Sequence, residues 1–198
     1  MNYLAHAYLS FNQPEVLVGN MISDYVKGKS QFDYPPGVQA GIRLHRAIDD
    51  FTDHHPATKQ MMELFRPQYR LYAGAFVDIV FDYFLANDRN EFKSDEMLHQ
   101  FTQQAYSQLQ NYTSLFPPRF AIMFPYMISQ NWLYHYQFDE GIQKSFNGLV
   151  RRAVYLTEAD IAFEIFGKNK GFLQEQYLVF FDSVKKFTAH TLQDLLKH

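Results

Sequence analysis

The sequence predicts an all-α protein, built as a single-domain helical bundle of about eight helices. Apolar residues recur at spacings of three and four nearly throughout, whereas runs that alternate polar and apolar residues are scarce. The 198 residues suit one domain, spanning 1–198, because no break is long enough to serve as a linker. Turn-forming residues interrupt the helical pattern at Pro14, 28–36, Pro56, Arg66-Pro67, 87–90, Pro117-Pro118 and 167–171.

The predicted boundaries have local causes. The residue before a proline avoids helical geometry, so one helix is predicted to end just before Pro56. Proline also lacks a backbone N–H, which supports further boundaries at Pro14 and Pro117. The last predicted element is one long helix over 172–198, which we expect to cover the core as a lid or brace.

Composition excludes several classes of protein. The absence of cysteine removes disulfides, thiolate zinc sites and cysteine nucleophiles. No window approaches the ~18 uninterrupted apolar residues of a membrane span, and the start of the chain lacks the basic and apolar regions of a signal peptide. We therefore expect a cytoplasmic protein with no membrane partner. A formal net charge of −3 gives no overall attraction to nucleic acid.

The stretch FVDIVFDYFL, residues 76–85, places two aspartates in an otherwise aromatic and aliphatic run. At ~100° per residue this helix is apolar all round, which predicts a central position, and Asp78 and Asp82 lie ~40° apart on it. A buried ionised carboxylate needs a partner. Two kinds of partner fit: a salt bridge from Arg66 or Arg70, or a divalent cation that both acids share.

The segment HRAIDDFTD, which begins at His45, separates into three arcs on a helical wheel. One arc is apolar, a second carries charge toward solvent, and the third combines His45 and Asp49 with small and aliphatic residues. The apolar arc contains Ala40, Leu44, Ala47, Ile48 and Phe51, and the solvent arc contains Arg43, Arg46, Asp50 and His54. A polar stripe beside a buried face is typical of the wall of a cleft. The alternative is a hydrogen bond from Asp49 that satisfies a core histidine.

Polar pairs four residues apart also occur at Asn2 and His6 and at Asn20 and Asp24, and such pairs share a helix face. Together the pairs supply two imidazoles and four carboxylates, which favour Mn²⁺, Mg²⁺ or Fe²⁺ over structural zinc. Without a glycine-rich phosphate loop or a G-x-S-x-G elbow, hydrolysis by metal-bound water is the remaining chemistry. The predicted metal ligands are His6, Asp24, His45, Asp49, Asp78 and Asp82.

Several short blocks follow one another along about three quarters of the chain. They are NYLAH at the start, GN and Asp24 within 19–24, GI-x-x-HR-x-ID-x-x-TD-x-x-P at 41–56, D-x-x-x-D-x-F at 78–84, PPRF at 117–120, Trp132-Leu133, and Gly148 with Arg151-Arg152. As an ordered set they resemble the acyl carrier protein phosphodiesterase family, also called acyl carrier protein hydrolyase. Each block alone is short, so the resemblance depends on the whole set.

The resemblance implies a helical fold distantly similar to the HD metal-dependent phosphohydrolases, with Mn²⁺ preferred. The implied reaction hydrolyses the phosphodiester that joins 4′-phosphopantetheine to a serine of holo-acyl carrier protein, which gives apo-acyl carrier protein. HD proteins have an aspartate directly after the histidine, but Arg46 follows His45 here, so Asp49 takes that place. The predicted catalytic residues are then Asp24, His45 and Asp49.

Two further sets of residues are predicted for this reaction. Asn20, Arg46 and Arg70 are candidates to orient the phosphate. Acyl carrier proteins are small and acidic, so a basic docking rim is expected near the cleft. The candidate residues of this rim are Lys27, Lys29, Arg119, Arg151 and Arg152.

Three other functions fit the same residues. An HD-like phosphohydrolase of a small nucleotide would keep the metal cluster and need no docking rim. A non-heme di-iron bundle would use E-x-x-H motifs such as the one from Glu96 to His99, but the sequence lacks a second copy. A helical interaction module would hold its buried acids in salt bridges with arginine.

Overall fold

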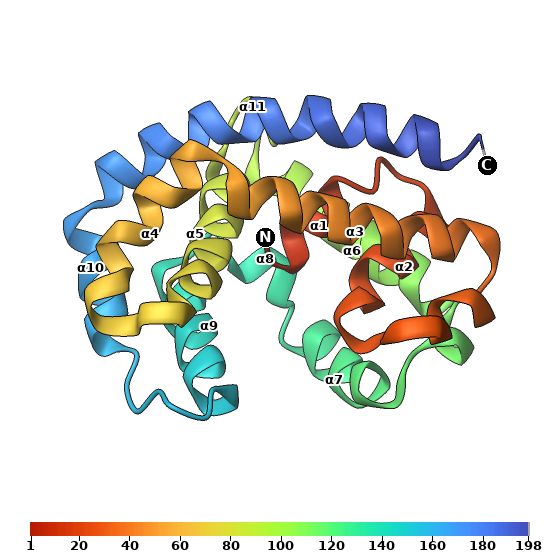
Figure 1. The fold of residues 1–198 in the computed structure, drawn as a ribbon, viewed down its shortest axis with the longest axis horizontal. Helices are drawn as coiled ribbons and strands as arrows, with labels where there is room; N and C mark the ends of the chain where they lie inside the picture. The colour runs from red at the N-terminus through yellow and green to blue at the C-terminus, as the bar shows by residue number, and fades with distance from the viewer. Residues whose placement is uncertain (198) are drawn as a thin grey trace.

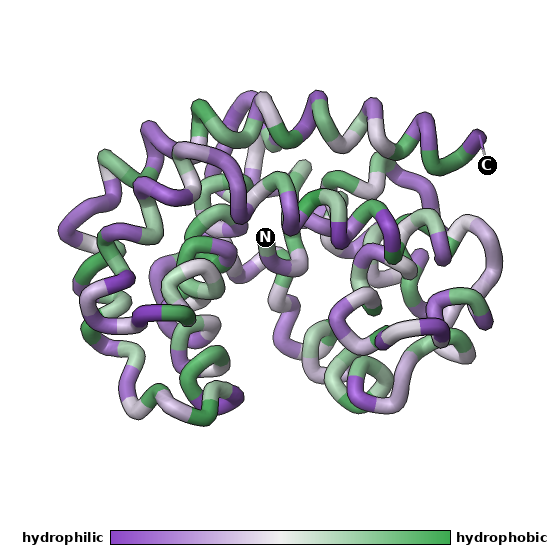
Figure 2. The backbone as a smooth tube through the Cα atoms, in the orientation of Figure 1, coloured by the Kyte–Doolittle hydropathy of each residue, from purple (hydrophilic) through white to green (hydrophobic). Residues whose placement is uncertain are grey.

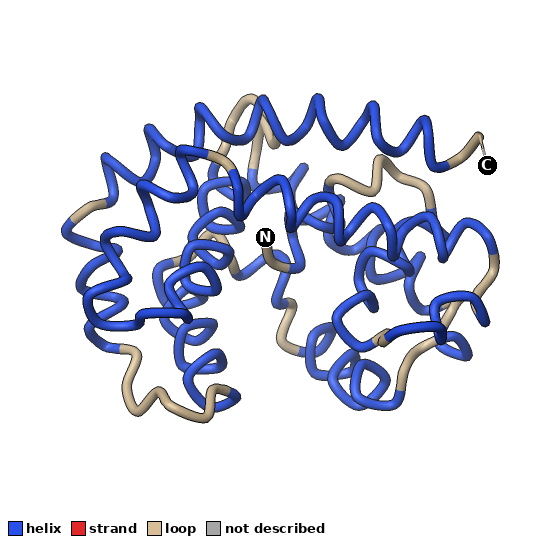
Figure 3. The backbone as a smooth tube through the Cα atoms, in the orientation of Figure 1, coloured by secondary structure: helices blue, strands red, loops and turns tan. Residues whose placement is uncertain are grey.

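The computed structural model describes residues 1–197, which form helices, turns and loops and contain no strand (Figures 1 and 3). The predicted all-α fold is confirmed. The α-helices are α1 (Tyr3–Tyr8), α2 (Pro14–Ile22), α3 (Pro36–His54), α4 (Pro56–Tyr69), α5 (Ala73–Asn87), α6 (Asp95–Gln110), α7 (Pro118–Ser129), α8 (Trp132–His135), α9 (Asp139–Arg152), α10 (Asp160–Lys168) and α11 (Lys170–Leu195). Short 3₁₀ helices occur at η1 (Ser23–Tyr25), η2 (Gly28–Asp33), η3 (Arg70–Tyr72) and η4 (Thr113–Leu115). None of the helices within residues 1–197 is long and apolar enough to cross a bilayer.

Helix α5 lies at the centre of the fold, as its apolar circumference predicts. It packs against α1, α4, α9 and α11. Aromatic rings fill these contacts: Phe76 packs against Phe65 and Phe146, and Phe81 stacks on Phe180 with ring centroids 4.3 Å apart. A fully buried phenylalanine contributes about 1.5–3 kcal/mol of hydrophobic stabilisation. The rings therefore fix α5, and with it the two aspartates that it carries.

Helices α2 and α3 cross with their backbones in close contact, because each helix has a glycine at the crossing. A Cβ added to Gly19 would lie 2.0 Å from the carbonyl oxygen of Val38, and one added to Gly41 would lie 2.2 Å from that of Val16. Only glycine allows so close an approach. The crossing brings the backbone that follows Gly19 against the arc of α3 that carries His45 and Asp49.

Helix α11 runs along one side of the molecule and covers α3, α4 and α5 (Figure 1). Hydrophobic and hydrophilic residues alternate along it (Figure 2), as expected for a helix with one buried face. Tyr177 fastens it to the loop after α5 by donating a hydrogen bond to Asp88 at 3.0 Å. The predicted brace is confirmed over Lys170–Leu195, whereas His198, its predicted end, lies outside the described residues.

Burial confirms the three arcs predicted for α3. Leu44 and Ile48 of the apolar arc are fully buried. In the third arc His45 is buried and Asp49 is partly exposed, so this arc crosses from the core to solvent. All four members of the solvent arc are exposed, namely Arg43, Arg46, Asp50 and His54.

The predicted helix count and one predicted boundary are wrong. Eleven α-helices, not about eight, occur in residues 1–197. Helix α4 continues through Pro67 and ends before Arg70, whose φ of 46° leaves the helical region. Three unpredicted breaks give the extra helices: a left-handed conformation at Asn131 with a φ of 47°, a turn at 136–138 between α8 and α9, and an irregular loop over 153–159. None of the three contains proline or glycine, so the usual turn signals are missing.

Candidate active site

Helices α1 and α3 meet at a cluster of histidine and aspartate side chains. The rings of His6 and His45 stack with their centroids 4.0 Å apart. Asp49, one turn after His45, places one carboxylate oxygen 3.2 Å from Nε2 of His6 and the other 3.0 Å from Nε2 of His45. Asp24 lies 3.3 Å from the same His45 nitrogen. One ligand atom each from His6, His45 and Asp49 lie within 4.8 Å of one another, so the structure brings three of the six predicted ligands to one point.

The cluster is closed on its imidazole side and open on its carboxylate side. The side chains of His6 and His45 are 3% and 8% exposed. That of Asp49 is 40% exposed and that of Asp24 is 69% exposed. A cation can therefore approach the two histidines past the carboxylates.

Asn20 orients both histidines from the crossing of α2 and α3. Its Nδ2 donates to the carbonyl of His6 at 2.9 Å and to Oγ of Ser10 at 3.1 Å, so its Oδ1 is left to accept from Nδ1 of His6 at 2.8 Å. Its backbone carbonyl accepts from Nδ1 of His45 at 2.7 Å. When neutral, both imidazoles therefore carry their proton on Nδ1 and turn the Nε2 lone pair toward Asp49. Metal-binding histidines are held in this way.

The Nε2 atom of His45 is buried and has no hydrogen-bond partner within residues 1–197, although two carboxylates lie near it. Buried polar atoms are normally satisfied, so an unpaired one calls for an explanation. A cation between this nitrogen and the carboxylates would satisfy it. The donor set of imidazole nitrogen and carboxylate oxygen fits a divalent cation such as Mn²⁺, Mg²⁺ or Fe²⁺.

The charges of the cluster favour a cation at the same point. Burial lowers the pKa of His45, but Asp24 and Asp49 outweigh it and raise the pKa to about 9. Burial and the adjacent His45 lower the pKa of His6 to about 4. Burial would raise the pKa of Asp49, yet the Met1 amino group and the two histidines hold it below its usual range. The potential that holds a proton on His45 also attracts a metal cation in its place.

The aspartate pair on α5 faces the start of the chain instead of the two histidines. Asp82 is fully buried, and its oxygens accept from the backbone N–H of Leu4 at 2.7 Å and of Ala5 at 3.1 Å. These N–H groups belong to the first turn of α1 and have no partner within that helix, so Asp82 caps it. Burial raises the pKa of Asp82 to about 7, and the two hydrogen bonds oppose this rise. Asp78 lies 3.0 Å from the amino group of Met1, which also contacts the cluster.

The alternative in which Arg66 or Arg70 pairs with the α5 aspartates is wrong. Arg66 pairs with Glu63 on its own helix. Arg70 is exposed, and no ion pair within residues 1–197 joins either arginine to the α5 pair. The actual partners are backbone amides and an amino group. Sequence reasoning missed them because a search for oppositely charged side chains passes over main-chain groups.

The three residues predicted to orient the phosphate lie in different surroundings. Asn20 is fully buried and engaged with the histidines, which favours a positioning role. Arg46 is exposed and donates to Gln31 at 2.8 Å and to the carbonyl of Val26 at 3.2 Å, so it fastens the segment after η1. Arg70 begins η3 and is exposed. A direct contact with phosphate stays a prediction for each of them.

A groove of about 800 Å³ lies beside the cluster, between the start of the chain and helices α8 and α9. Figure 1 shows the N-terminus next to α8, with α9 below it. Asn2 and Tyr3 line the groove, and the carbonyl of Met1 just before them lies 3.1 Å from Nε2 of His6. Of the predicted docking rim, Arg151 and Arg152 line the groove, whereas Lys27, Lys29 and Arg119 are exposed outside its lining.

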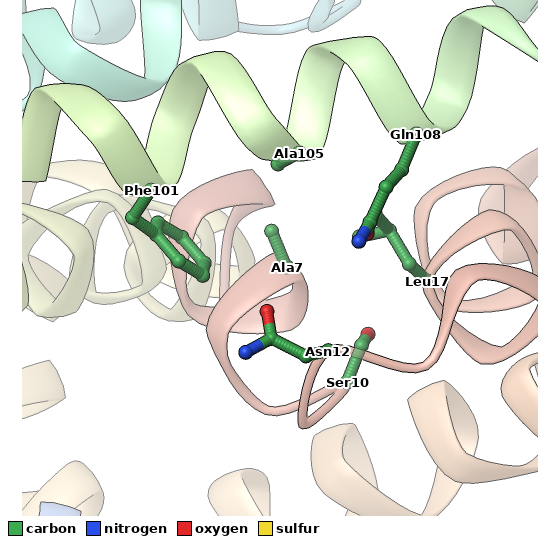
Figure 4. Close-up of a pocket in the computed structure, with 7 residues that line it drawn as sticks. All are labelled: Ala7, Ser10, Asn12, Leu17, Phe101, Ala105 and Gln108. Carbon is green, nitrogen blue, oxygen red and sulfur yellow. The ribbon is translucent and has the colours of Figure 1, made fainter.

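A second and much smaller cavity lies between α6 and the turn after α1 (Figure 4). Its volume of about 10 Å³ has room for about one water molecule, so we assign no ligand to it. It is lined by Ala7, Ser10, Asn12, Leu17, Phe101, Ala105 and Gln108.

Comparison with known proteins agrees with the blocks found in the sequence. The profile of the family described as Acyl carrier protein phosphodiesterase matches residues 1–184. The chain belongs to the acyl carrier protein phosphodiesterase family. Curated relatives with this name include those of Salmonella paratyphi A and Escherichia coli O45:K1, each 36% identical over 152 residues, and that of Klebsiella pneumoniae strain 342, 37% identical over 152 residues. Each alignment covers 77% of this chain and 79% of the relative.

In this member of the acyl carrier protein phosphodiesterase family, the matched residues include the whole cluster and the whole groove. No solved structure matches the chain significantly, so similarity to the HD phosphohydrolases stays a prediction. The tyrosine and tryptophan residues of the groove, Tyr3, Trp132 and Tyr136, had no predicted role. The blocks NYLAH and Trp132-Leu133 contain a signal for the first two, whereas Tyr136 lies outside every block.

Proposed function

We propose that the chain is a divalent-metal-dependent phosphodiesterase, which cleaves 4′-phosphopantetheine from the serine of holo-acyl carrier protein and gives apo-acyl carrier protein, with Mn²⁺ as its metal. The observation that supports this most directly is the convergence of His6, His45 and Asp49 beside a groove, in a chain of this family. The printed name of the relatives indicates the substrate. The donor atoms indicate the class of cation.

Each residue of the cluster has a separate task in this proposal. His6, His45 and Asp49 hold the cation, and Asn20 fixes the proton of each neutral imidazole on Nδ1, which aims the Nε2 atoms at the cation. When bound, the cation offsets the charge of the phosphodiester and lowers the pKa of water enough to supply hydroxide near neutral pH. Asp24, the most exposed carboxylate of the cluster, accepts the proton that water releases.

Turnover of holo-acyl carrier protein is the direct test. After dialysis against a chelator the protein should be inactive, and Mn²⁺ should restore apo-acyl carrier protein, which mass spectrometry detects as loss of the phosphopantetheine mass. Saturating metal should also stabilise the fold by about 2.7 kcal/mol at a hundredfold excess over Kd. Unchanged melting and turnover with Mn²⁺, Mg²⁺ and Fe²⁺ would contradict the metal role. Hydrolysis of small nucleotides alone would favour the nucleotide phosphohydrolase instead.

We further propose that Arg151 and Arg152 attract the acidic carrier protein to the mouth of the groove. Both are exposed in the last turn of α9, and neither has an ion-pair partner within residues 1–197. Unpaired surface charge acts mainly on encounter and orientation. Changing both arginines to Glu should therefore raise KM for holo-acyl carrier protein tenfold or more, since ~1.4 kcal/mol corresponds to a factor of ten.

A matched charge-reversal variant distinguishes the effect of charge at the groove from the effect of net charge on KM. Arg43 and Lys59 are exposed outside the lining of the groove, so changing both to Glu should leave KM unchanged. Added salt should weaken wild-type activity toward the level of the Arg151/Arg152 variant. Equal rises in KM for the two double variants would show that net charge matters and would remove the docking role.

A further inference from the structure

One face of α9 forms a wall of the groove, and it is open at its middle. The lining residues on this helix recur every three or four positions, as one helical face requires. They include Gly141, Lys144, Ser145, Gly148, Arg151 and Arg152. A Cβ added to Gly148 would meet no heavy atom within 4 Å. The absence of a side chain at Gly148 therefore leaves space that a ligand can occupy.

The lining of the groove combines polar and apolar surface and carries little net charge. Asn2, Gln130, Ser145 and Asn147 offer amide and hydroxyl groups, and the rings of Tyr3, Trp132 and Tyr136 offer apolar surface. Glu140 and Lys144 neutralise each other at 2.7 Å. The remaining formal charge is positive and belongs to Arg151 and Arg152. Such a lining suits a neutral chain that contains amides and is attached to an anion.

Tyr3 connects the groove to the cluster. Its hydroxyl lies 3.0 Å from that of Tyr25, the residue after Asp24. Burial raises the pKa of Tyr3 well above its usual value, the nearby Tyr25 and Asp24 raise it further, and the positive charge of Arg152 opposes them. Tyr3 therefore lies within electrostatic reach of both Asp24 and Arg152. Because Tyr3 lines the groove and its hydroxyl contacts that of Tyr25, it joins the groove to the segment that carries Asp24.

We propose that the groove holds the pantetheine arm of the substrate, with its phosphate end toward the cluster. This inference rests on the proposed function, because that function supplies the arm. The arm is a linear neutral chain with two amides, a hydroxyl and two methyl groups on one carbon, which match the amide, hydroxyl and ring groups of the lining. The volume of about 800 Å³ lies within the roughly 300–1,000 Å³ usual for small-molecule sites.

The fluorescence of Trp132 reports whether the groove holds a ligand, because Trp132 is the one tryptophan of the chain and it lines the groove. Titration with pantetheine, which lacks the phosphate, should give a saturable change in tryptophan fluorescence. Inorganic phosphate is the parallel probe. A response to phosphate without one to pantetheine would show an anion site alone and would overturn the inference. A response to adenosine but not to pantetheine would assign the groove to a nucleoside and overturn it as well.

Variants at glycine fill the groove without touching the cluster. Gly148→Phe should abolish the fluorescence response to pantetheine and raise KM for holo-acyl carrier protein at least tenfold, whereas Gly148→Ala adds one carbon in open space and should respond to pantetheine. Gly167→Phe is the matched control, since a Cβ at this position on α10 also meets no heavy atom within 4 Å. Circular dichroism and melting confirm that each variant is folded.

The two proposals fail in different ways. If folded Gly148→Phe responds to pantetheine and cleaves holo-acyl carrier protein with the wild-type KM, the groove assignment is overturned and the proposed reaction stands. If wild-type protein with Mn²⁺ does not cleave holo-acyl carrier protein, the proposed reaction itself is overturned.

Discussion

Two polar pairs at four-residue spacing, His45 with Asp49 on α3 and Asp78 with Asp82 on α5, have the same geometry along their helices but different surroundings. The α3 pair faces a second imidazole, that of His6, and opens to solvent through Asp49. The α5 pair faces the start of the chain. Asp82 is fully buried there and binds two backbone amides of α1.

The difference shows that spacing determines a shared face, while the opposing element determines the role. Helix α3 is crossed by α2, whose Asn20 fixes both histidines with their Nε2 atoms toward Asp49. Helix α5 is opposed by the first turn of α1, whose N–H groups have no partner within that helix. The same kind of pair therefore forms a candidate cation site on one helix and a helix cap on the other.

Loss of His45 from the α3 pair should reduce activity more than any other change. His45→Ala should reduce turnover of holo-acyl carrier protein at least about 100-fold, because even residues behind a metal ligand typically contribute 10–100-fold. Helical content should stay nearly constant, since Leu44 and Ile48 form the core face of α3. His54→Ala is the control on the same helix, where the side chain is 72% exposed, and it should match the wild type. An equal loss of turnover in the two variants would show that the arc with His45 and the solvent arc do not differ in function.

Sequence patterns were sufficient for features that depend on one helix at a time. The apolar circumference of α5 predicted its central position, and the three arcs of α3 predicted which side chains are buried. The glycines at the α2–α3 crossing were visible too, in the GN and GI blocks. Glycine inside a helix is destabilising unless something requires it, and here the close approach at Gly19 and Gly41 requires it.

Features that join separate segments were not predictable in this way. The groove combines Asn2 and Tyr3 with α8 and α9, which are more than a hundred residues further along the chain. The cap at Asp82 depends on backbone amides, which every residue except proline has, so no residue type signals them. Periodicity within a helix carries no information about which other segment packs against it.

The second prediction concerns how the α3 pair makes the stability of the fold depend on pH. In the metal-free protein the pKa of His45 is about 9, above its ordinary 6.5, so the folded state binds this proton more tightly than the unfolded state. The resulting stabilisation is complete below pH 6.5 and is lost as the pH rises from 6.5 to 9. It amounts to at most about 3 kcal/mol, since a tenfold change in proton affinity corresponds to about 1.4 kcal/mol.

Urea unfolding in chelator at pH 6.5 and pH 9 measures this stabilisation. His45→Gln cannot titrate, so it should lose less stability than the wild type between the two pH values. If both proteins lose the same amount, the proton on His45 does not stabilise the fold, and the negative potential assigned to the α3 pair is contradicted.

The last and smallest effect concerns the α5 pair. Asp82→Asn should lower the free energy of unfolding by about 1–3 kcal/mol. The amide has one oxygen left to accept from the two N–H groups of Leu4 and Ala5, and its NH₂ group is placed against one of these donors. Asp78→Asn should cost less, since the carboxylate of Asp78 is 31% exposed and water can replace part of its contact. Urea unfolding in chelator compares the two variants.

Adding Mn²⁺ to the same variants distinguishes a residue that caps a helix from one that binds the metal. Stabilisation by a bound ion depends on the affinity of its site and not on how stable the metal-free fold is, so saturating Mn²⁺ should stabilise Asp82→Asn as much as the wild type if Asp82 only caps α1. Asp78 shares the Met1 amino group with Asp49, so Asp78→Asn should retain most of its metal-free stability and lose part of the Mn²⁺ effect. The reverse result is that Asp82→Asn is stable without metal and gains nothing from Mn²⁺. That result would show that Asp82 is a metal ligand, as the sequence predicted, and that the two pairs have the same role.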